Sequence, residues 1–212
     1  IDRPAIASSL PTRQSHCYML DLGANVDCSA EHLFQFALMG SVLAEAVDGI
    51  SRPRIGLLNV GAEEIKGNEQ VKLASLLIRQ HSQLNYIGYI EGDDIYAGKA
   101  DVVVCDGFVG NIALKSSEGL ARLVGRSVES AFSQSLWRRM LRRLVSPVLD
   151  DLHQLLDPSL RNGASLLGLR GIVVKSHGSA NRECFAHAIE QARIEVTRDL
   201  SQTLNRRLAE IS

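Results

Sequence analysis

The sequence has few cysteines, few prolines and few aromatic residues. Its 212 residues include four cysteines, five prolines and one tryptophan, and aromatic residues make up 5% of the chain. The cysteines are Cys17, Cys28, Cys105 and Cys184, and no two of them form a C-x-x-C pair. This spacing excludes the common zinc motifs and argues against a disulfide framework. We therefore predict four reduced thiols and no metal site.

A strong charge of one sign is also absent, and so is a long apolar run. The formal net charge is -1, so we expect no binding to nucleic acid. No apolar segment reaches the ~20 residues that a membrane-spanning helix needs, and no signal peptide opens the chain. These features predict a cytoplasmic protein. The chain starts at Ile1 without an initiator Met, so we expect it to be part of a longer protein.

Short apolar segments alternate with longer segments of helical periodicity. We predict strands at 17–22, 54–60, 86–90, 101–105 and 172–175, and helices at 31–47, 68–79, 111–132 and 180–208. This alternation is typical of βαβ units, so the fold class is α/β, Rossmann-like, with a mostly parallel sheet between two layers of helices. We expect one α/β unit over 1–212, from which the helical segment 133–156 protrudes.

Three loops of similar composition follow predicted strands and lead into helices. They cover residues 21–27 (DLGANVD), 106–111 (DGFVGN) and 175–181 (KSHGSAN). A helix N-terminus offers free N–H groups and a partial positive charge, which suit phosphate. Turn formation and helix capping are the alternative explanation for each loop. Because all three follow strands, we predict that they converge at one edge of the sheet as an anion site.

Within these loops we predict catalytic roles for Lys175, His177 and Asn25. A lysine and an imidazole can offset phosphate charge, and an Asn amide can donate hydrogen bonds. A fourth loop, 59–67, also follows a strand and adds a lysine. The predicted phosphate- or substrate-binding residues are Gly23, Ala24, Asp27, Gly61, Lys66, Asp106, Gly107, Gly110, Asn111, Ser176 and Gly178. For Lys66, a plain surface position is an equally good explanation.

Known nucleotide and hydrolase motifs are missing, but four other motifs resemble one family. The sequence contains no G-x-x-x-x-G-K-[ST], no G-x-G-x-x-G and no G-x-S-x-G. The segments LDLGANVDC (20–28), LLNVG (57–61) followed by KG (66–67), VCDGFVGN (104–111), and GLRG (168–171) followed by KSHG (175–178) resemble PlsX-type phosphate acyltransferases. The resemblance runs from Ile1 to about Ala188.

The resemblance implies a reaction in which inorganic phosphate attacks the thioester of an acylated acyl carrier protein and forms acyl-phosphate. It implies a fold like that of isocitrate and isopropylmalate dehydrogenases, a homodimer, and neither nucleotide nor metal cofactor. Proteins of this family begin with a Gly- and Asp-rich segment and a Ser-Ala-Gly-Asn-Thr-Gly-type motif that this chain lacks. We therefore expect a C-terminal fragment that is inactive by itself.

The segment 136–149 (LWRRMLRRLVSPVL) predicts a basic amphipathic helix. Such a helix can lie in an anionic membrane interface, and the resemblance implies the same peripheral association. Packing of the apolar stripe against a second copy of the chain is the alternative. Pro147 is expected to break the helix at the tip of a hairpin. The predicted membrane-binding residues are Leu136, Trp137, Arg138, Arg139, Met140, Leu141, Arg142, Arg143, Leu144 and Val145.

Two other functions are alternatives to an acyltransferase that uses acyl carrier protein and phosphate. One is a phosphotransacetylase that uses acyl-coenzyme A, which would not need a basic membrane helix. The other is a non-catalytic membrane scaffold that binds acyl carrier protein. The retained phosphate-type loops argue against the scaffold.

Overall fold

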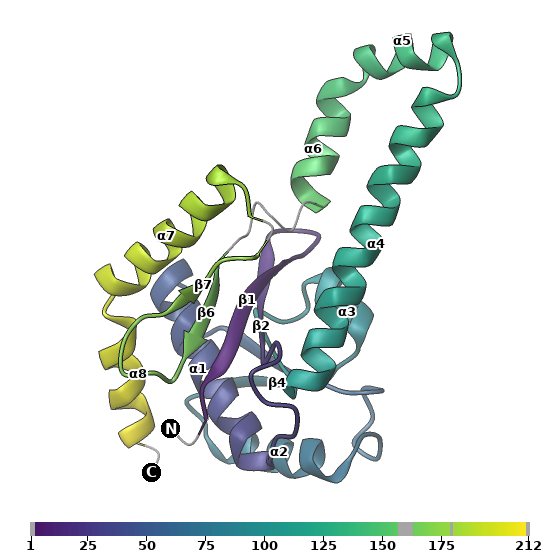
Figure 1. The fold of residues 1–212 in the computed structure, drawn as a ribbon. Coiled ribbons are helices and arrows are strands. Elements are labelled where there is room, and N and C mark those ends of the chain that lie inside the picture. The colour runs from purple at the N-terminus through teal and green to yellow at the C-terminus, as the bar shows by residue number, and fades with distance from the viewer. Residues whose placement is uncertain (1–2, 157–162, 179, 211–212) are drawn as a thin grey trace.

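The computed structural model describes residues 3–156, 163–178 and 180–210, which form one sheet with helices on both faces (Figure 1). The strands are β1 (Ala5–Pro11), β2 (His16–Leu20), β3 (Arg54–Leu58), β4 (Asn85–Ile90), β5 (Val102–Val104), β6 (Ala164–Leu167) and β7 (Val174–Lys175). The helices are α1 (Ala30–Asp48), α2 (Glu69–Gln80), α3 (Gly92–Ala97), α4 (Gly107–Ser133), α5 (Leu136–Leu144), α6 (Ser146–Leu156), α7 (Arg182–Thr197) and α8 (Leu200–Ala209).

The strands are ordered β4-β3-β5-β2-β1-β6-β7. The first four are parallel to one another, whereas β1 is antiparallel to both β2 and β6, and β7 is antiparallel to β6. It follows that β6 shares the direction of β2, while β1 and β7 run the opposite way. The predicted α/β class with a mostly parallel sheet is confirmed. Strands β1 and β6 were not predicted, because their Ser and Ala residues weaken the apolar signal.

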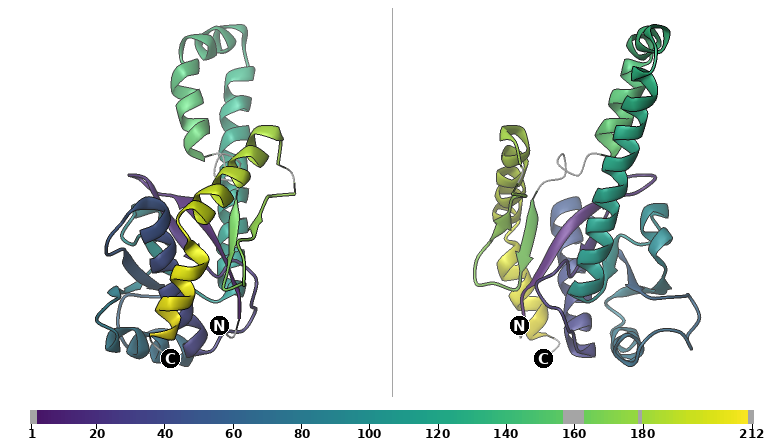
Figure 2. Two further views of the ribbon diagram at one scale, coloured as in Figure 1. Left: turned by 90° about the vertical axis from the view of Figure 1, so that its left-hand side faces the viewer. Right: turned by 45° about the vertical axis from the view of Figure 1, so that its right-hand side comes forward.

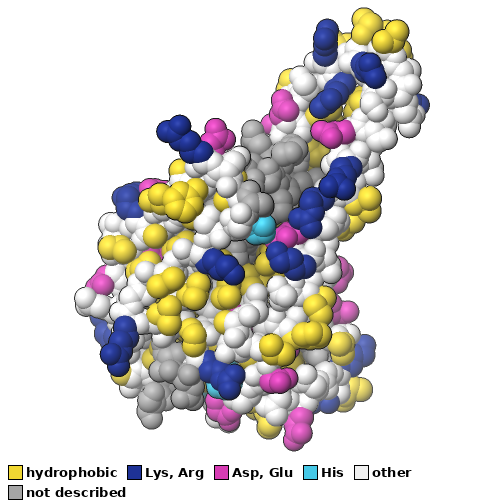
Figure 3. All heavy atoms as spheres, viewed as in Figure 1, with side chains coloured by type: hydrophobic (Ala, Val, Ile, Leu, Met, Phe, Trp, Pro, Cys, Tyr) yellow, Lys and Arg dark blue, Asp and Glu magenta, His cyan; other side chains and the backbone are white. Residues whose placement is uncertain are grey.

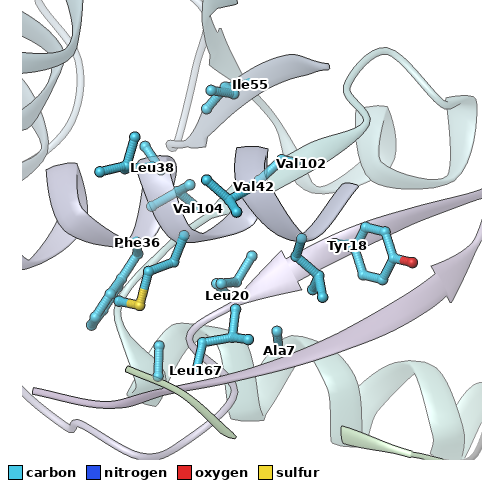
Figure 4. Packing of buried hydrophobic residues seen from close by; sticks show 14 of the residues in the cluster. Ala7, Tyr18, Leu20, Phe36, Leu38, Val42, Ile55, Val102, Val104 and Leu167 are labelled. Carbon is cyan, nitrogen blue, oxygen red and sulfur yellow. The ribbon is translucent and has the colours of Figure 1, made fainter. Parts of the chain in front are cut away.

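Both faces of the sheet are buried, as the apolar run of β5 predicts. Val102 and Val104 pack in the core beneath α1, with Phe36 and Leu38 (Figure 4). Val103 points to the opposite face and joins a second cluster that includes Ile95 of α3. The β-branched residues of β5 therefore pack into the hydrophobic clusters on both faces of the sheet. The strand lies in the middle layer, between two layers of helices.

Helices α1, α2, α7 and α8 cover one face, and α3 and the start of α4 cover the other (Figure 2). The predicted closing helix 180–208 is interrupted: α7 ends at Thr197, and Asp199 adopts a left-handed backbone with φ 54° before α8. This kink lets Leu200 and Leu204 turn into the core beside α1.

Helices α4, α5 and α6, residues 107–156, form an arm that projects from the body (Figure 1). Helix α4 rises from the sheet, α5 lies across the outer end, and α6 returns beside α4. Pro147 does not occupy the tip as predicted. The break falls at Val145, and Pro147 lies in the first turn of α6, where its missing N–H group costs no helical hydrogen bond.

Candidate active site

Two of the predicted loops meet where β2 and β5 end. These strands are parallel neighbours, so their carboxyl ends lie at the same edge of the sheet, where ligands bind in folds of this kind. Asp21, the first residue after β2, is fully buried. Its Oδ1 accepts hydrogen bonds from the N–H groups of Ile6 (2.9 Å) and Ala24 (3.1 Å). The carboxylate thus holds the loop to β1 without a cation.

Asn25 completes this arrangement. Its backbone N–H (2.6 Å) and its side-chain Nδ2 (2.9 Å) both donate to Asp21 Oδ2, and Nδ2 also donates to the carbonyl of Pro4 (2.8 Å). Both amide hydrogens are therefore in use, and none is left for a substrate in this structure. We predicted a catalytic amide donor at Asn25, but the geometry makes it a positioning residue that fixes the loop.

Gly107 and Gly110 are required by contact between the two loops. A Cβ atom at Gly107 would overlap the carbonyl oxygen of Asn25, and one at Gly110 would overlap that of Asp21. The N–H of Gly107 also donates to the Asn25 carbonyl at 2.9 Å. These glycines therefore bring backbone against backbone, whereas we expected them to bring backbone against a ligand.

The N-terminus of α4 faces this edge and is partly capped. Asp106 Oδ1 accepts from the N–H of Val109 at 2.9 Å, and the Asp106 carbonyl accepts from Gly110 at 2.9 Å. Within the described ranges, the structure gives no acceptor to the N–H of Phe108. This group is the donor of the first turn that remains for a ligand. Asn111 is exposed next to Gly23, so its amide is accessible from the same side.

A hollow of about 780 Å³ adjoins these loops, and we call it the carboxyl-edge hollow. Its walls are largely apolar, with the carboxylates of Asp27 and Asp106 among its polar groups. The lining residues are Val26, Asp27, Cys28, Ser29, Leu33, Asn68, Gln70, Val71, Asp106, Phe108 and Val109. Such walls suit an acyl chain or an extended thioester arm, and the hollow contains none of the predicted cations.

The two cysteines at this edge are poor nucleophiles. Burial raises the pKa of the half-buried Cys28 thiol to about 11, and it raises the pKa of the buried Cys105 thiol well above its ordinary value. Since the thiolate is the reactive form, neither cysteine is activated near neutral pH. A nucleophile from outside the protein fits this site better.

The fourth loop, 59–67, follows β3 and lies at the same edge, because β3 is parallel to β5. Asn59 holds it closed by donating from Nδ2 to the carbonyls of Gly61 (3.1 Å) and Lys66 (3.2 Å). Lys66 Nζ forms an ion pair with Glu63 at 2.9 Å, which raises the pKa of Lys66. Lys66 is exposed and already paired with an acidic neighbour, as its alternative surface role predicts.

The third loop does not join the others, so the predicted convergence of three loops is wrong. Strand β7 runs opposite to β2, and its carboxyl end therefore lies at the opposite edge of the sheet. Figure 2 shows the starts of α4 and α7 at opposite ends of the body. Lys175, Ser176, His177 and Gly178 are therefore separated from Asn25 and Asn111.

The predicted membrane segment forms α5, whose side chains are largely exposed. Leu136 is 79% exposed, Trp137 66%, Met140 61% and Leu144 77%. Figure 3 shows apolar side chains at the outer end of the arm, with cationic side chains next to them. The helix is amphipathic as predicted, and the described residues leave most of its apolar stripe uncovered, with Leu141 half-buried. No helix among the described residues combines the length and apolar character that a membrane span requires.

Residues 1–203 match the family model described as "Fatty acid synthesis protein". The chain belongs to this family. The match confirms the membership inferred from the four motifs, and it includes both loops at the carboxyl edge and the whole arm.

The curated relatives are similar over nearly the whole chain. The chain is 58% identical over 211 residues to the phosphate acyltransferase of Ectopseudomonas mendocina (strain ymp), which covers 100% of this chain and 62% of the relative. It is 58% identical over 208 residues to that of Alkalilimnicola ehrlichii, covering 98% of this chain and 60% of the relative. The chain thus spans about three fifths of the length of these relatives.

A solved structure supports the fold alone. The branched-chain phosphotransacylase from Enterococcus faecalis V583 superposes with a TM-score of 0.58 over 91% of this chain and 64% of that protein, at 15% sequence identity. This level of identity is too low to transfer a substrate. It agrees with the α/β layers and with the sheet topology described above.

Asp21 and Phe108 are the site residues that sequence reasoning did not assign. Asp21 is the first residue of a recognised loop, and a buried carboxylate directly after an apolar strand was the available signal. Phe108 contributes a backbone N–H, which side-chain chemistry does not reveal. The sequence predicted free N–H groups at this helix N-terminus, but not which of them the cap leaves without an acceptor.

Proposed function

We propose that this chain is part of an acyltransferase that makes acyl-phosphate from an acylated acyl carrier protein and inorganic phosphate. The observation that carries the proposal is the family match over residues 1–203, together with relatives named phosphate acyltransferase at 58% identity. Two features of the site support the proposed reaction. It has an apolar hollow beside a helix N-terminus, and its cysteines are not activated.

In the proposed reaction, a phosphate oxygen attacks the carbonyl carbon of the thioester. The C–O bond forms, the carbonyl oxygen becomes an oxyanion, and the C–S bond then breaks to release the carrier thiolate, which takes up a proton from water. Backbone N–H groups such as that of Phe108 stabilise the oxyanion, and one donor of this kind is worth about 2.7–4 kcal/mol. No protein nucleophile and no metal or nucleotide cofactor takes part.

The buried network around Asp21 keeps these backbone donors in place. Asp21 and Asn25 hold the first loop, and Gly107 ties that loop to the start of α4. The acyl thioester lies in the carboxyl-edge hollow, beside Phe108. A contribution of Lys175 and His177 to the same phosphate requires a homodimer in which the second chain's loop reaches this edge.

The test is whether thioester consumption depends on phosphate. A protein that carries this chain at the full length of the relatives is incubated with acyl-(acyl carrier protein), and free carrier thiol is measured with and without phosphate. We expect thiol release only with phosphate. An acyl group trapped on Cys28 or Cys105 would overturn the mechanism, and equal turnover of acyl-coenzyme A would favour the phosphotransacetylase alternative.

We also propose that α5 docks the protein peripherally on the inner face of the cell membrane, with the body in the cytoplasm. Complete burial of an apolar side chain of this size gives roughly 1.5–3 kcal/mol, and each arginine adds about 1 kcal/mol near an anionic surface. Interfacial burial is partial, so the sum supports reversible attachment only. The exposure of Leu136, Trp137, Met140 and Leu144 supports this proposal.

Sedimentation with anionic vesicles tests the docking. Wild type is compared with the double variant Trp137→Glu plus Leu141→Glu, and circular dichroism verifies that both are folded. We expect the variant to stay in the supernatant. Equal sedimentation of both proteins would contradict membrane docking, and a change from dimer to monomer in the variant would assign the stripe to a subunit interface.

A further inference from the structure

The four arginines of α5 do not share one environment. Arg138 turns toward the end of α4, where its Nη1 donates to the carbonyl of Ala131 at 3.2 Å and to the side chain of Gln134. The other three line a separate hollow of about 420 Å³, which we call the tip hollow. Its lining residues are Phe132, Ser133, Arg139, Arg142, Arg143 and Ser146.

The tip hollow is strongly cationic, and its charge is little compensated. Arg142 Nη2 lies 3.9 Å from Glu129 Oε1, at the outer limit of an ion pair. Across residues 3–156, the structure gives no ion pair to Arg139 or Arg143. Three guanidinium groups around one concave space repel one another unless an anion lies between them. The tip hollow therefore favours an anionic ligand.

The shape of the tip places this charge where a lipid head group would be. On α5, the apolar residues Leu136, Met140 and Leu144 follow one another at intervals of four, so they share one face. Arg139 and Arg143 also lie four residues apart, and they flank this face, because Arg139 is three residues from Leu136 and Arg143 is three residues from Met140. When the apolar face enters the acyl-chain region, these arginines lie at its border, and their long side chains can extend to the level of the phosphates.

We propose that the tip hollow is a site for a lipid head group with a terminal phosphate, as in phosphatidic acid. A phosphomonoester has three terminal oxygens and up to two negative charges, which match three guanidinium groups. A phosphodiester offers one charge and two such oxygens, and so satisfies fewer donors. This proposal rests on the membrane docking proposed above and adds a preference among anionic lipids.

The test compares two variants of equal charge on the same helix. Arg142→Gln removes a guanidinium group from the tip hollow, and Arg138→Gln removes one outside it. Binding is measured to phosphatidylcholine vesicles that contain either phosphatidic acid or phosphatidylglycerol at the same surface charge. Loss of one arginine near an anionic surface weakens binding about fivefold for either lipid.

We expect wild type and Arg138→Gln to prefer phosphatidic acid by about tenfold, and Arg142→Gln to lose this preference. A ratio between the two lipids that is the same in all three proteins would overturn the tip hollow as a head-group site and leave membrane docking intact. Failure of wild type to bind either vesicle would overturn both. Absence of the preference in wild type, together with binding of inorganic phosphate by wild type but not by Arg142→Gln, would show that the hollow takes free phosphate, which also overturns the lipid assignment.

Discussion

The carboxyl edge of the sheet and the tip of the arm carry the two proposed activities, and they are built in opposite ways. At the carboxyl edge, the polar groups are buried and satisfy one another: Asp21 alone accepts four hydrogen bonds. At the tip, most apolar side chains of α5 are exposed, and Arg139 and Arg143 have no ion-pair partner among the described residues. Folding alone therefore holds the polar groups of the edge in place, whereas the exposed groups of the tip gain partners only on binding.

The largest effect on stability is expected from a methyl group between the two loops of the carboxyl edge. Gly110→Ala places a Cβ atom on the carbonyl oxygen of Asp21, and neither backbone can move without breaking the network. We expect a loss of about 3 kcal/mol or more in the free energy of unfolding, measured by urea denaturation. Gly119→Ala is the control in the same helix, because nothing lies within 4 Å of its added Cβ. It should stabilise the protein by up to about 1 kcal/mol.

A smaller loss is expected from Asp21→Asn. The amide would direct its own hydrogens at N–H donors of Asn25 or Ile6, and it would leave at least one buried donor without an acceptor. We expect about 2–3 kcal/mol of destabilisation, together with loss of phosphate-dependent thiol release in the full-length protein. Asp106→Asn is the matched control, since Asn is as good a helix N-cap as Asp. Equal stability of both variants would refute the organising role of Asp21.

The buried surroundings of Cys28 are expected to suppress the reactivity of its thiol. A pKa of about 11 in place of 9.0 lowers the thiolate fraction at pH 8 about a hundredfold. Alkylation of Cys28 by iodoacetamide, followed by mass spectrometry, should therefore be about a hundredfold slower than that of a free cysteine, and its rate should climb up to about pH 11. A rate that levels off near pH 7 would reveal an activated thiol and reopen covalent catalysis.

The smallest effect on stability is expected at the tip. Trp137→Glu plus Leu141→Glu should lower the free energy of unfolding by about 1–1.5 kcal/mol in total, most of it at the half-buried Leu141, because the exposed Trp137 contributes little to folding. The same variant should lose vesicle binding. Strong destabilisation of the variant would show that the stripe is buried in the native assembly, and the contrast between edge and tip would then disappear.

Much of the edge could be predicted from local pattern. The valine run of β5 predicts a strand buried on both faces, and Val102 to Val104 fill both cores. The loops after β2 and β5 were expected to meet, and they do, because β2 pairs in parallel with β5 and their carboxyl ends lie side by side. The amphipathic character of α5 could also be predicted from the sequence, because the helical period alone determines which side chains share a face.

Other features depended on contacts between distant segments. The sequence around Lys175 and His177 resembles the other two loops, yet β7 runs the opposite way, so this loop opens at the other edge. The direction of β7 follows from its antiparallel pairing with β6, a short strand with a weak sequence signal. The amino-acid composition of a loop indicates which ligands it can bind, but the direction of the preceding strand decides at which edge of the sheet the loop lies.

By itself, the sequence determined the family, the α/β layers and the amphipathic helix, because each depends on residue order and on short-range periodicity. Only the tertiary structure decided the roles of individual polar groups. It bound both amide hydrogens of Asn25 to Pro4 and Asp21, and it separated Arg138 from Arg139, Arg142 and Arg143. The physical reason is that a polar side chain forms hydrogen bonds with the groups that folding brings within reach. Those groups can be distant in the sequence.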